Sequence, residues 1–380
     1  MKRTILIFLA LCGLTLWSVA QNCSTPVVVQ QLKDNRWRYG YVKNDGTVVA
    51  DCIYYRAKAF SEGLAAIRDI NGIWGFIDTT GKQVITMPRE VSEVGTFKEG
   101  LCWFRDRDQD LVGYIDRQGK VILSPQWGFA QDFSDGLAAV GTAQTFGNMR
   151  NITGLTGYID HSGKVVIPIG EKHSNIGSES FNSHRAVINK FGEVTIIDQA
   201  GNTIVERPEY EYAKTFSEGL CAVKVRTNWP CGNEENERKC ISKWGFIDTA
   251  GNMVIKPQYD EYGSFSEGVC AINTGEGYAF IDQTGENVMG RLFKKAKSFS
   301  DGVAYVEEMN GTEAFIDHSG KVVVAIPDGF TAEGNSIGGL IEISKKETSE
   351  GIADNIDIMI NHKGETVWKY AWLEWIGYDE

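Results

Sequence analysis

The sequence is poor in proline and in basic residues. Proline occurs 8 times in 380 residues, whereas glycine occurs 42 times. Frequent glycine with scarce proline is typical of a chain with many turns of positive φ, and not of a flexible low-complexity segment. Lysine and arginine number 38 against 50 acidic residues, which gives a net charge of −12. Because nucleic-acid affinity comes largely from basic side chains, this charge disfavours nucleic acids and anionic lipid surfaces as partners.

Long apolar runs are also missing, apart from one at the start of the chain. Lys2 and Arg3 precede an apolar stretch from Thr4 to Trp17, and Ser18-Val19-Ala20 then supplies small residues before Gln21. This order is typical of a cleavable signal peptide, whereas a membrane span needs about 20 apolar residues. We therefore expect residues 1–20 to be removed and residues 21 onward to be exported to the periplasm, the cell surface or the medium, without a stable membrane span.

What the sequence does have is a repeated phrase. Its clearest copy runs Lys243-Trp244-Gly245-Phe246-Ile247-Asp248, and after Gly251 it continues through an apolar segment to Phe265-Ser266-Glu267-Gly268. The glycines that close the central part of each copy stand at positions 46, 81, 119, 163, 201, 251, 285, 320 and 364. Copies in this phase predict a tandem array of about nine units over residues 21–366.

Each unit is predicted to contain three short strands. In one copy these are Gly63 to Ile67, Trp74 to Asp78 and Lys82 to Thr86, all rich in β-branched and aromatic residues and bounded by turn residues. The Asp-x-x-Gly link between the second and third strands predicts a tight turn, in which the carboxylate accepts a hydrogen bond from the backbone two residues on. The glycine of Phe-Ser-Glu-Gly predicts a second corner.

These copies resemble the WG, or KWG, repeat family, most closely at Lys243 to Asp248 and at Ile73 to Asp78. The resemblance extends from about Trp37 to Gly364. One copy departs from the pattern, with His184 and Arg185 where the corner glycine and the leucine after it are expected. The resemblance implies a bacterial surface, periplasmic or cytoplasmic repeat protein, and it supplies no catalytic residues.

Two all-β architectures fit such an array. Three strands in units as short as 34 residues, and diverged copies at both ends, favour an open β-solenoid or superhelix with capped ends. The alternative is a closed β-propeller of eight or nine blades, whose units usually hold four strands. Residues 367–380 are expected to form the C-terminal cap. Their tryptophans could share a helical face from Val367 to Ile376, but we favour a capping strand or turn.

The recurring aspartates invite a calcium-binding or catalytic interpretation. Calcium needs six to eight converging oxygens, and acid–base catalysis needs carboxyl groups in contrasting environments, whereas these residues are copies of one turn. They are Asp78, Asp116, Asp160, Asp198, Asp248, Asp282 and Asp317. The histidines lack metal-ligand spacing; they are His161, His173, His184, His318 and His362. Three of them, His161, His318 and His362, follow the turn residue, where we expect them to be exposed. We therefore predict turn roles, no enzymatic activity, no cofactor and no metal.

The cysteines suggest one disulfide. Cys231 and Cys240 bracket an acidic insertion at a hairpin tip, where facing strands approach closely enough for a bridge in an exported protein. Cys23 and Cys52 could also pair. The remaining three occupy the position that Ala65 and Ala138 fill in other copies, which predicts small buried side chains; they are Cys102, Cys221 and Cys270.

Length variation gives the best indication of function. It is concentrated between the first two strands of the units, at Arg105 to Leu111, Gly141 to Leu155, Arg226 to Ser242 and Lys345 to Asp357. When insertions occur at the same place in successive repeats, they lie along one rim of the array and often form its binding face. We therefore predict a non-catalytic scaffold that binds a protein partner through this rim.

The alternative is a cell-envelope carbohydrate-binding module. Trp37, Trp74 and Trp244 recur in the copies and could form a row of exposed stacking surfaces. The competing interpretation is that these aromatic side chains pack between units, because repeats share a continuous core. A glycan partner is therefore kept as the second hypothesis.

Overall fold

The computed structural model describes residues 25–33, 36–142, 144–146, 149–151, 156–168, 180–190, 192–226, 241–332, 334–349 and 352–375. These residues form strands, turns and loops, with no helix among them. The strands belong to ten antiparallel sheets, nine of which follow one another as the units of the array. The prediction of an all-β tandem repeat is therefore confirmed.

The strands fall into units as follows. The first three units contain β1 (Val27–Lys33), β2 (Arg36–Val42) and β3 (Val48–Tyr54); β4 (Arg56–Ala57), β5 (Leu64–Arg68), β6 (Trp74–Asp78) and β7 (Gln83–Thr86); and β8 (Val91–Val94), β9 (Leu101–Asp106), β10 (Leu111–Asp116) and β11 (Val121–Trp127). The next three contain β12 (Phe129–Ala130), β13 (Ala138–Gly141), β16 (Thr156–Ile159) and β17 (Val165–Ile167), with an added hairpin of β14 (Gln144–Phe146) and β15 (Met149–Asn151); β18 (Arg185–Lys190), β19 (Glu193–Asp198) and β20 (Thr203–Glu206); and β21 (Tyr210–Ala213), β22 (Leu220–Arg226), β23 (Ser242–Asp248) and β24 (Met253–Tyr259). The last three contain β25 (Cys270–Asn273) and β26 (Tyr278–Ile281); β27 (Lys295–Ala296), β28 (Ala304–Glu307), β29 (Glu313–Ile316) and β30 (Val322–Ala325); and β31 (Thr331–Ala332), β32 (Leu340–Ser349), β33 (Ile352–Asn361) and β34 (Thr366–Trp375).

In eight of the nine units the three predicted strands are present in the predicted order, as β5, β6 and β7 show, whereas the seventh unit has only β25 and β26 among its described residues. Among the described residues, six of the nine units have a fourth strand, which pairs with the outer edge of the first predicted strand. In the second unit this is β4, only two residues long, in which Ala57 pairs with Ile67. Such a short segment has no hydrophobic period of its own, so the sequence pattern did not indicate it.

The central strands are buried on both faces. In β5, Leu64, Ala65, Ala66 and Ile67 are all at most 7% exposed. Because successive side chains of a strand point to opposite faces, Ala65 and Ile67 pack toward the first unit, whereas Leu64 and Ala66 pack toward the third. A continuous apolar run in the sequence therefore reflects a strand covered by a neighbouring sheet on each side.

The glycine of the Trp-Gly pair allows the third strand to approach closely. A Cβ atom at Gly75 would lie 2.7 Å from the carbonyl oxygen of Ile85, and one at Gly245 would lie 2.6 Å from that of Ile255. Directly after this point the pairing register between the second and third strands shifts, as between Phe76 and Ile77. Glycine is therefore required there by the close approach of two backbones.

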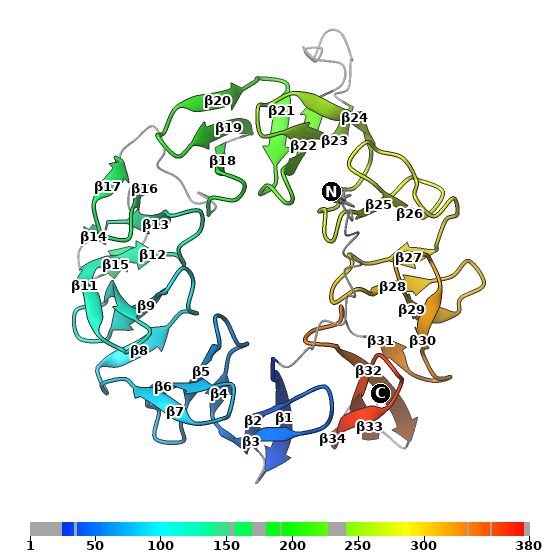
Figure 1. Cartoon of the computed structure of the whole chain (residues 1–380), viewed down its shortest axis with the longest axis horizontal. Coiled ribbons are helices and arrows are strands. Elements are labelled where there is room, and N and C mark those ends of the chain that lie inside the picture. The colour runs from blue at the N-terminus through cyan, green and yellow to red at the C-terminus, as the bar shows by residue number, and fades with distance from the viewer. Residues whose placement is uncertain are drawn as a thin grey trace, which may run out of the picture.

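The array is a closed ring. The apolar core is divided into nine clusters, each of which joins two successive units, and one of them joins the ninth unit to the first. In that cluster Val27 and Val29 of β1 pack with Leu340 of β32, and the Trp368 side chain lies against them. The indole nitrogen of Trp368 donates a hydrogen bond to the Gln30 carbonyl (3.2 Å). Figure 1 shows the first and last units side by side, completing the ring.

Of the two arrangements that the sequence left open, the structure therefore has the closed, propeller-type ring. The diverged end copies that favoured an open array with caps are complementary to each other instead. The expected C-terminal cap is β34, a strand and not a helix, which pairs along β33 from Ile352 opposite Trp375 to Ile360 opposite Thr366. It is the third long strand of the ninth unit, and it covers the first unit.

We predict that Trp368→Ala lowers the free energy of unfolding by about 2 kcal/mol. This is below the 3–5 kcal/mol typical of a fully buried tryptophan, because this side chain is only partly buried. Urea denaturation followed by circular dichroism measures the change. Ile70→Ala is the matched control, because Ile70 is 70% exposed and belongs to no core cluster; equal stability of the two variants would contradict a closure that depends on this contact.

Candidate functional site

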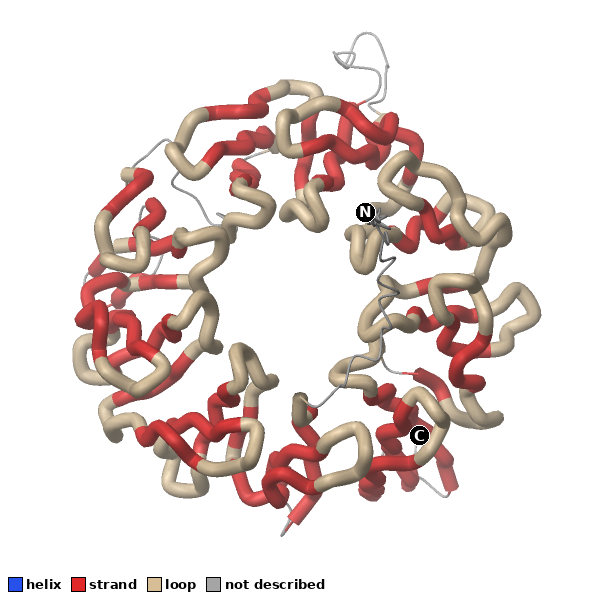
Figure 2. The backbone as a smooth tube through the Cα atoms, viewed as in Figure 1, coloured by secondary structure: helices blue, strands red, loops and turns tan. Residues whose placement is uncertain are grey.

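Each unit presents two sets of loops at opposite ends of its strands. At one end lie the Asp-x-x-Gly turns and the corners that precede the first long strand, of which Phe60 to Gly63 is an example. At the other end lie the tips that join the first two long strands, such as 69–73 between β5 and β6. Because the units pack on one another in the same orientation, all tips emerge on one face, which we call the tip rim. Figure 2 shows the corner loops directed toward the centre of the ring.

The Asp-x-x-Gly turns have the predicted geometry. In the second unit the Asp78 carboxylate accepts hydrogen bonds from the amides of Thr80 (2.9 Å) and Lys82 (3.1 Å). Gly81 has a φ of +86°, in the left-handed region that glycine adopts without strain. Equivalent pairs of bonds occur at Asp116, Asp160, Asp198, Asp248, Asp282 and Asp317. The carboxylates thus organise turns.

The corners are linked from unit to unit by hydrogen bonds. The Glu62 carboxylate accepts bonds from the amides of Glu99 (2.6 Å) and Gly100 (3.0 Å) in the next corner. The Glu99 carboxylate binds the Gly136 amide in the same way (3.0 and 3.2 Å). Further links of this kind run from Asp135 to His184, from Ser183 to Gly219, from Glu218 to Gly268, from Glu267 to Gly302 and from Asp301 to Gly339. We call this series the corner relay.

The residue that provides the side-chain acceptor is held in the left-handed conformation. Glu62, Glu99 and Glu267 have φ values of +52°, +52° and +54°. In the diverged copy His184 itself has a φ of +60°, and its amide donates to Asp135 (2.7 Å). The copy that departs from the pattern therefore keeps the corner turn, and the charge-assisted bond offsets the strain of a non-glycine residue there.

Serine side chains strengthen the corner relay. Ser61 Oγ donates to the carbonyl oxygen of Phe97 (2.6 Å), and Ser134 Oγ donates to that of Phe181 (2.5 Å). The same bond joins Ser217 to Phe265, Ser266 to Phe299 and Ser300 to Ser336. These five corners thus bind the next one through side chain and backbone together.

Two histidines that were expected to be exposed turn residues lie against this relay. His161 stacks on Phe133 with ring centroids 4.3 Å apart, and its Nε2 is 3.1 Å from Glu99 Oε2. His318 stacks on Phe299 at 4.0 Å and lies 3.5 Å from Glu267 Oε2. Their side chains remain 42% and 43% exposed, so the expectation holds for exposure but missed their contacts.

His362 occupies the same position in the ninth unit, where Ser336 replaces the corner phenylalanine. His362 Nε2 lies 2.8 Å from Ser336 Oγ, which also donates to Asp301 (3.0 Å). Burial lowers the pKa of the histidine. Ser336 is fully buried between the side chains of His362 and Asp301. Its hydroxyl group is therefore not exposed as a nucleophile would be. His173 lies outside the described residues.

We predict that the turn carboxylates make stability pH-dependent below pH 4. Hydrogen bonds from hydroxyl side chains lower the pKa of Asp78, Asp160 and Asp317 in the folded protein. The unfolded value is about 3.9, so this stabilisation is present above that pH and is lost as the pH falls through the lower folded value. In the triple variant to asparagine, the urea midpoint should fall less steeply between about pH 5 and pH 2.

Asp328→Asn is the control for this series, because Asp328 is exposed in a link and belongs to no Asp-x-x-Gly turn. A triple variant whose urea midpoint follows that of the control at every pH would show that the turn carboxylates do not contribute.

The tip rim holds the structural additions. The insertion from Gly141 to Leu155 contains the extra hairpin β14–β15, and the one from Lys345 to Asp357 extends β32 and β33 until Ser349 pairs with Ile352. The tip from Arg105 to Leu111 is a short turn in which Arg105 and Asp110 form an ion pair (3.1 Å). Residues 227–240, within the fourth insertion, lie outside the described residues.

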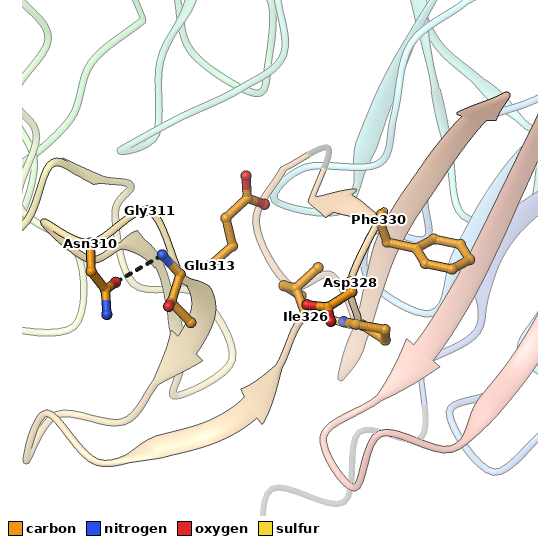
Figure 3. Close-up of a pocket in the computed structure, with 9 residues that line it drawn as sticks. Asn310, Gly311, Glu313, Ile326, Asp328 and Phe330 are labelled. Carbon is orange, nitrogen blue, oxygen red and sulfur yellow. Dashed lines mark hydrogen bonds between the residues drawn. The ribbon is translucent and has the colours of Figure 1, made fainter. Parts of the chain in front are cut away.

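Grooves lie between a tip and the link that leads to the next unit. One groove, of about 280 Å³, separates the tip at Asn310 and Gly311 from the link Ile326 to Phe330. Figure 3 shows Glu313 reaching between the two segments, and its carboxylate accepts a bond from the Ala332 amide (3.3 Å). A groove of about 460 Å³ has the equivalent place between the tip at Gly192 and the link Glu206 to Pro208.

The tryptophans proposed as a sugar platform do not form a row. Trp74 is 2% exposed and Trp244 is 7% exposed. The Trp74 indole nitrogen donates to the Ser92 carbonyl of the third unit (2.9 Å), so the side chain packs between units. Pairing places Tyr39, and not Trp37, at the position of Trp244, because Tyr39 faces Tyr54 as Trp244 faces Tyr259.

An exposed aromatic group nevertheless lies beside Trp244. Tyr262 is 47% exposed and lies with its ring centroid 5.0 Å from that of Trp244, and Tyr212 is 38% exposed with a centroid distance of 6.3 Å. Lys214 Nζ lies 4.2 Å from the Tyr262 ring. The sequence pattern did not indicate either tyrosine, because both lie in the strands or links that precede the corners, outside the repeated Trp-Gly-Phe-Ile-Asp segment.

The cysteines in the alanine position are buried, as predicted. Cys102, Cys221 and Cys270 are all 0% exposed. Burial raises the pKa of the Cys102 thiol, and it raises that of Cys270 to about 12, so both thiols are unreactive near neutral pH. Cys52 is a buried free thiol that points to the Val29 carbonyl (3.9 Å). Cys231, Cys240 and Cys23 lie outside the described residues, so the disulfide between Cys231 and Cys240 stays a prediction.

The described residues contain no helix long and apolar enough to span a membrane. No cluster of three or more histidine, cysteine or acidic residues with metal-binding geometry occurs in this part of the chain.

The fold and its links define a closed ring of β-repeats. The model of the WG-containing repeat matches residues 39–72, 74–108, 113–141, 157–170, 195–229, 244–278 and 278–312, more than half of the chain. The chain belongs to the family of WG-repeat proteins. None of the curated proteins matches the chain significantly.

Several solved structures show a weaker similarity to this chain. A eukaryotic initiation factor has 10% identity and a TM-score of 0.49, over 82% of this chain and 97% of the other. BamB from Moraxella catarrhalis has 12% identity and a TM-score of 0.35, over 83% and 84%. The WD40 β-propeller domain of Doa1 has 9% identity and a TM-score of 0.32, over 77% and 86%. The closed ring of this chain is defined by the contacts between its own first and last units.

Proposed function

We propose that this protein is an exported, non-catalytic scaffold that binds a protein partner through its tip rim. The observation that carries the proposal is the difference between the two ends of the units. At the corner end, acceptors and amides are used within the molecule by the corner relay and the Asp turns. At the other end, loop length varies and extra strands are added. Variation confined to one face of a repeat array is typical of a binding face.

Two structural features support this face as a recognition surface. The strands below it are covered on both sides, so a change in a tip leaves the core intact. The grooves beside Asn310 and Gly192 give the face concave sites at equivalent places in two units. Export is part of the proposal because of the signal-like residues 1–20, which lie outside the described residues.

We predict that deletion of residues 232–239 weakens capture of a partner without unfolding the ring. The full chain, immobilised and exposed to an envelope extract, should retain a defined set of proteins that the deletion variant retains at least about tenfold less. Thermal unfolding of the two chains should agree within a few degrees, because the deleted residues lie within a tip.

Gln118→Ala is the matched control, because Gln118 is exposed in an Asp turn at the other end of the strands. Retention of the same proteins by the deletion variant and by the parent chain would contradict a role for this tip. Equal loss in the control would show that the rim is not the binding face.

A second candidate function is carbohydrate binding, which the exposed pair Tyr212 and Tyr262 beside Trp244 favours. Aromatic faces flanked by polar groups stack on sugar rings, and here Lys243 and Asp260 form an ion pair next to the cluster.

We predict that, if this surface binds sugar, an envelope glycan changes the tryptophan fluorescence of the parent chain, and Tyr262→Ala weakens that binding about tenfold. Tyr55→Ala is the control, since Tyr55 is 47% exposed in a different unit. A glycan array without any bound sugar would eliminate this candidate and leave the protein-binding proposal untouched.

A further inference from the structure

The seventh unit departs from the other units at one position before its corner. The residue three places before the corner phenylalanine ends the fourth strand in five units, where it is alanine or valine: Ala57, Val94, Ala130, Ala213 and Ala296. In the seventh unit this residue is Tyr262, and among the described residues no fourth strand pairs with β25. A tyrosine is too large for a position that is fully buried at Val94 and Ala213, and its side chain lies at the surface instead, 47% exposed.

Tyr262 completes an aromatic surface that begins in the sixth unit. Tyr212 pairs with Lys224, and Lys224 pairs with Trp244, so these three side chains lie on one face of the sheet. The centroid of the Trp244 ring is 5.0 Å from that of Tyr262 and 6.3 Å from that of Tyr212. A buried tryptophan therefore supports two tyrosines whose side chains stay partly exposed.

An ammonium group lies between the two tyrosines. Lys214 Nζ is 5.1 Å from the centroid of the Tyr212 ring and 4.2 Å from that of the Tyr262 ring. The backbone of this lysine is fixed, because its amide donates to the Ala222 carbonyl oxygen (2.9 Å). Contacts with ring faces use none of the three N–H donors of an ammonium group. They leave these donors to an anionic acceptor.

The charges of this surface favour a ligand with one carboxylate. Its other two lysines are in ion pairs, Lys224 with Glu211 (3.5 Å) and Lys243 with Asp260 (2.5 Å), and Lys214 belongs to neither pair. A single carboxylate can therefore pair with Lys214. The carboxylates of Glu211 and Asp260, together with the net charge of −12, repel a ligand that carries many negative charges.

We propose that this surface binds an oligosaccharide that carries one acidic sugar, such as a uronic acid. The acidic sugar packs on Tyr262, its carboxylate accepts hydrogen bonds from Lys214 Nζ, and a neighbouring sugar packs on Tyr212. Tyrosine suits such a ligand, because its ring packs on the C–H face of a sugar while its hydroxyl group bonds to polar groups. The proposal rests on the carbohydrate-binding candidate described above, and it names the class of sugar that this candidate recognises.

The test uses the full chain and an array of acidic oligosaccharides, each printed beside its carboxyl-reduced form, in which the uronic acid has become a neutral hexose. The acidic form of a bound sugar should bind about tenfold more tightly than the reduced form, because reduction removes a charge-assisted hydrogen bond. Lys214→Gln should weaken binding of the acidic form about tenfold and leave that of the reduced form unchanged. Tyr262→Ala should weaken binding of both forms.

Lys297→Gln is the matched control, because Lys297 has the same place in the eighth unit. Its amide donates to the Tyr305 carbonyl oxygen (3.0 Å), and its Nζ lies 5.3 Å from the centroid of the Tyr305 ring. Tyr305 is only 5% exposed, so the ring beside this lysine is covered. The control should bind the array as the parent chain does. Near-ultraviolet circular dichroism and the melting temperature show that each variant is folded.

Equal binding of the acidic and reduced forms would overturn the acidic class and leave the carbohydrate-binding candidate in place. An array without any bound sugar would overturn both. Equal loss in Lys214→Gln and Lys297→Gln would also overturn the proposal, because the overall charge and not this surface would then control binding. Displacement of the bound sugar by an equal concentration of a peptide with a single glutamate would assign the surface to acidic protein segments instead.

Discussion

The structure depends on apolar burial that each unit shares with its two neighbours. Alternate side chains of a strand such as Leu64 to Ile67 belong to different clusters, one on each side of the sheet. No unit therefore has a core of its own, and stability comes from the interfaces between successive copies. A terminal unit of an open array would leave one such face exposed, and the contact of Val27, Val29 and Trp368 across the closure removes both ends at once.

The two ends of the strands also differ in how their loops are held. At the corner end, successive corners bind one another, because the carboxylates of Glu62, Glu218 and Glu267 accept hydrogen bonds from amides of the following corner. Residues at the corners are constrained by their left-handed backbone conformation and by hydrogen bonds from the next copy. The same sequence pattern therefore recurs at the corners around the ring. The tips are not held by such a series of bonds, and they differ in length.

Much of the unit could be predicted from sequence alone. The three long strands, the Asp-x-x-Gly turns and the small buried side chains at Cys102 and Cys270 follow from local pattern, because pairing within a hairpin and turn chemistry are short-range. The fourth strand was missed, since two residues such as Arg56–Ala57 carry no periodicity. The contacts of His161 and His318 with the preceding corner were missed as well, because their partners lie in other units. The exposed tyrosines beside Trp244 were missed for the same reason.

The sequence by itself determined the number of units, the class of fold and the end of each unit at which length varies, because these are properties of one copy repeated along the chain. Only the tertiary structure decided that the array closes, since closure depends on how a small rotation per unit accumulates until residues about 340 positions apart, such as Gln30 and Trp368, come into contact.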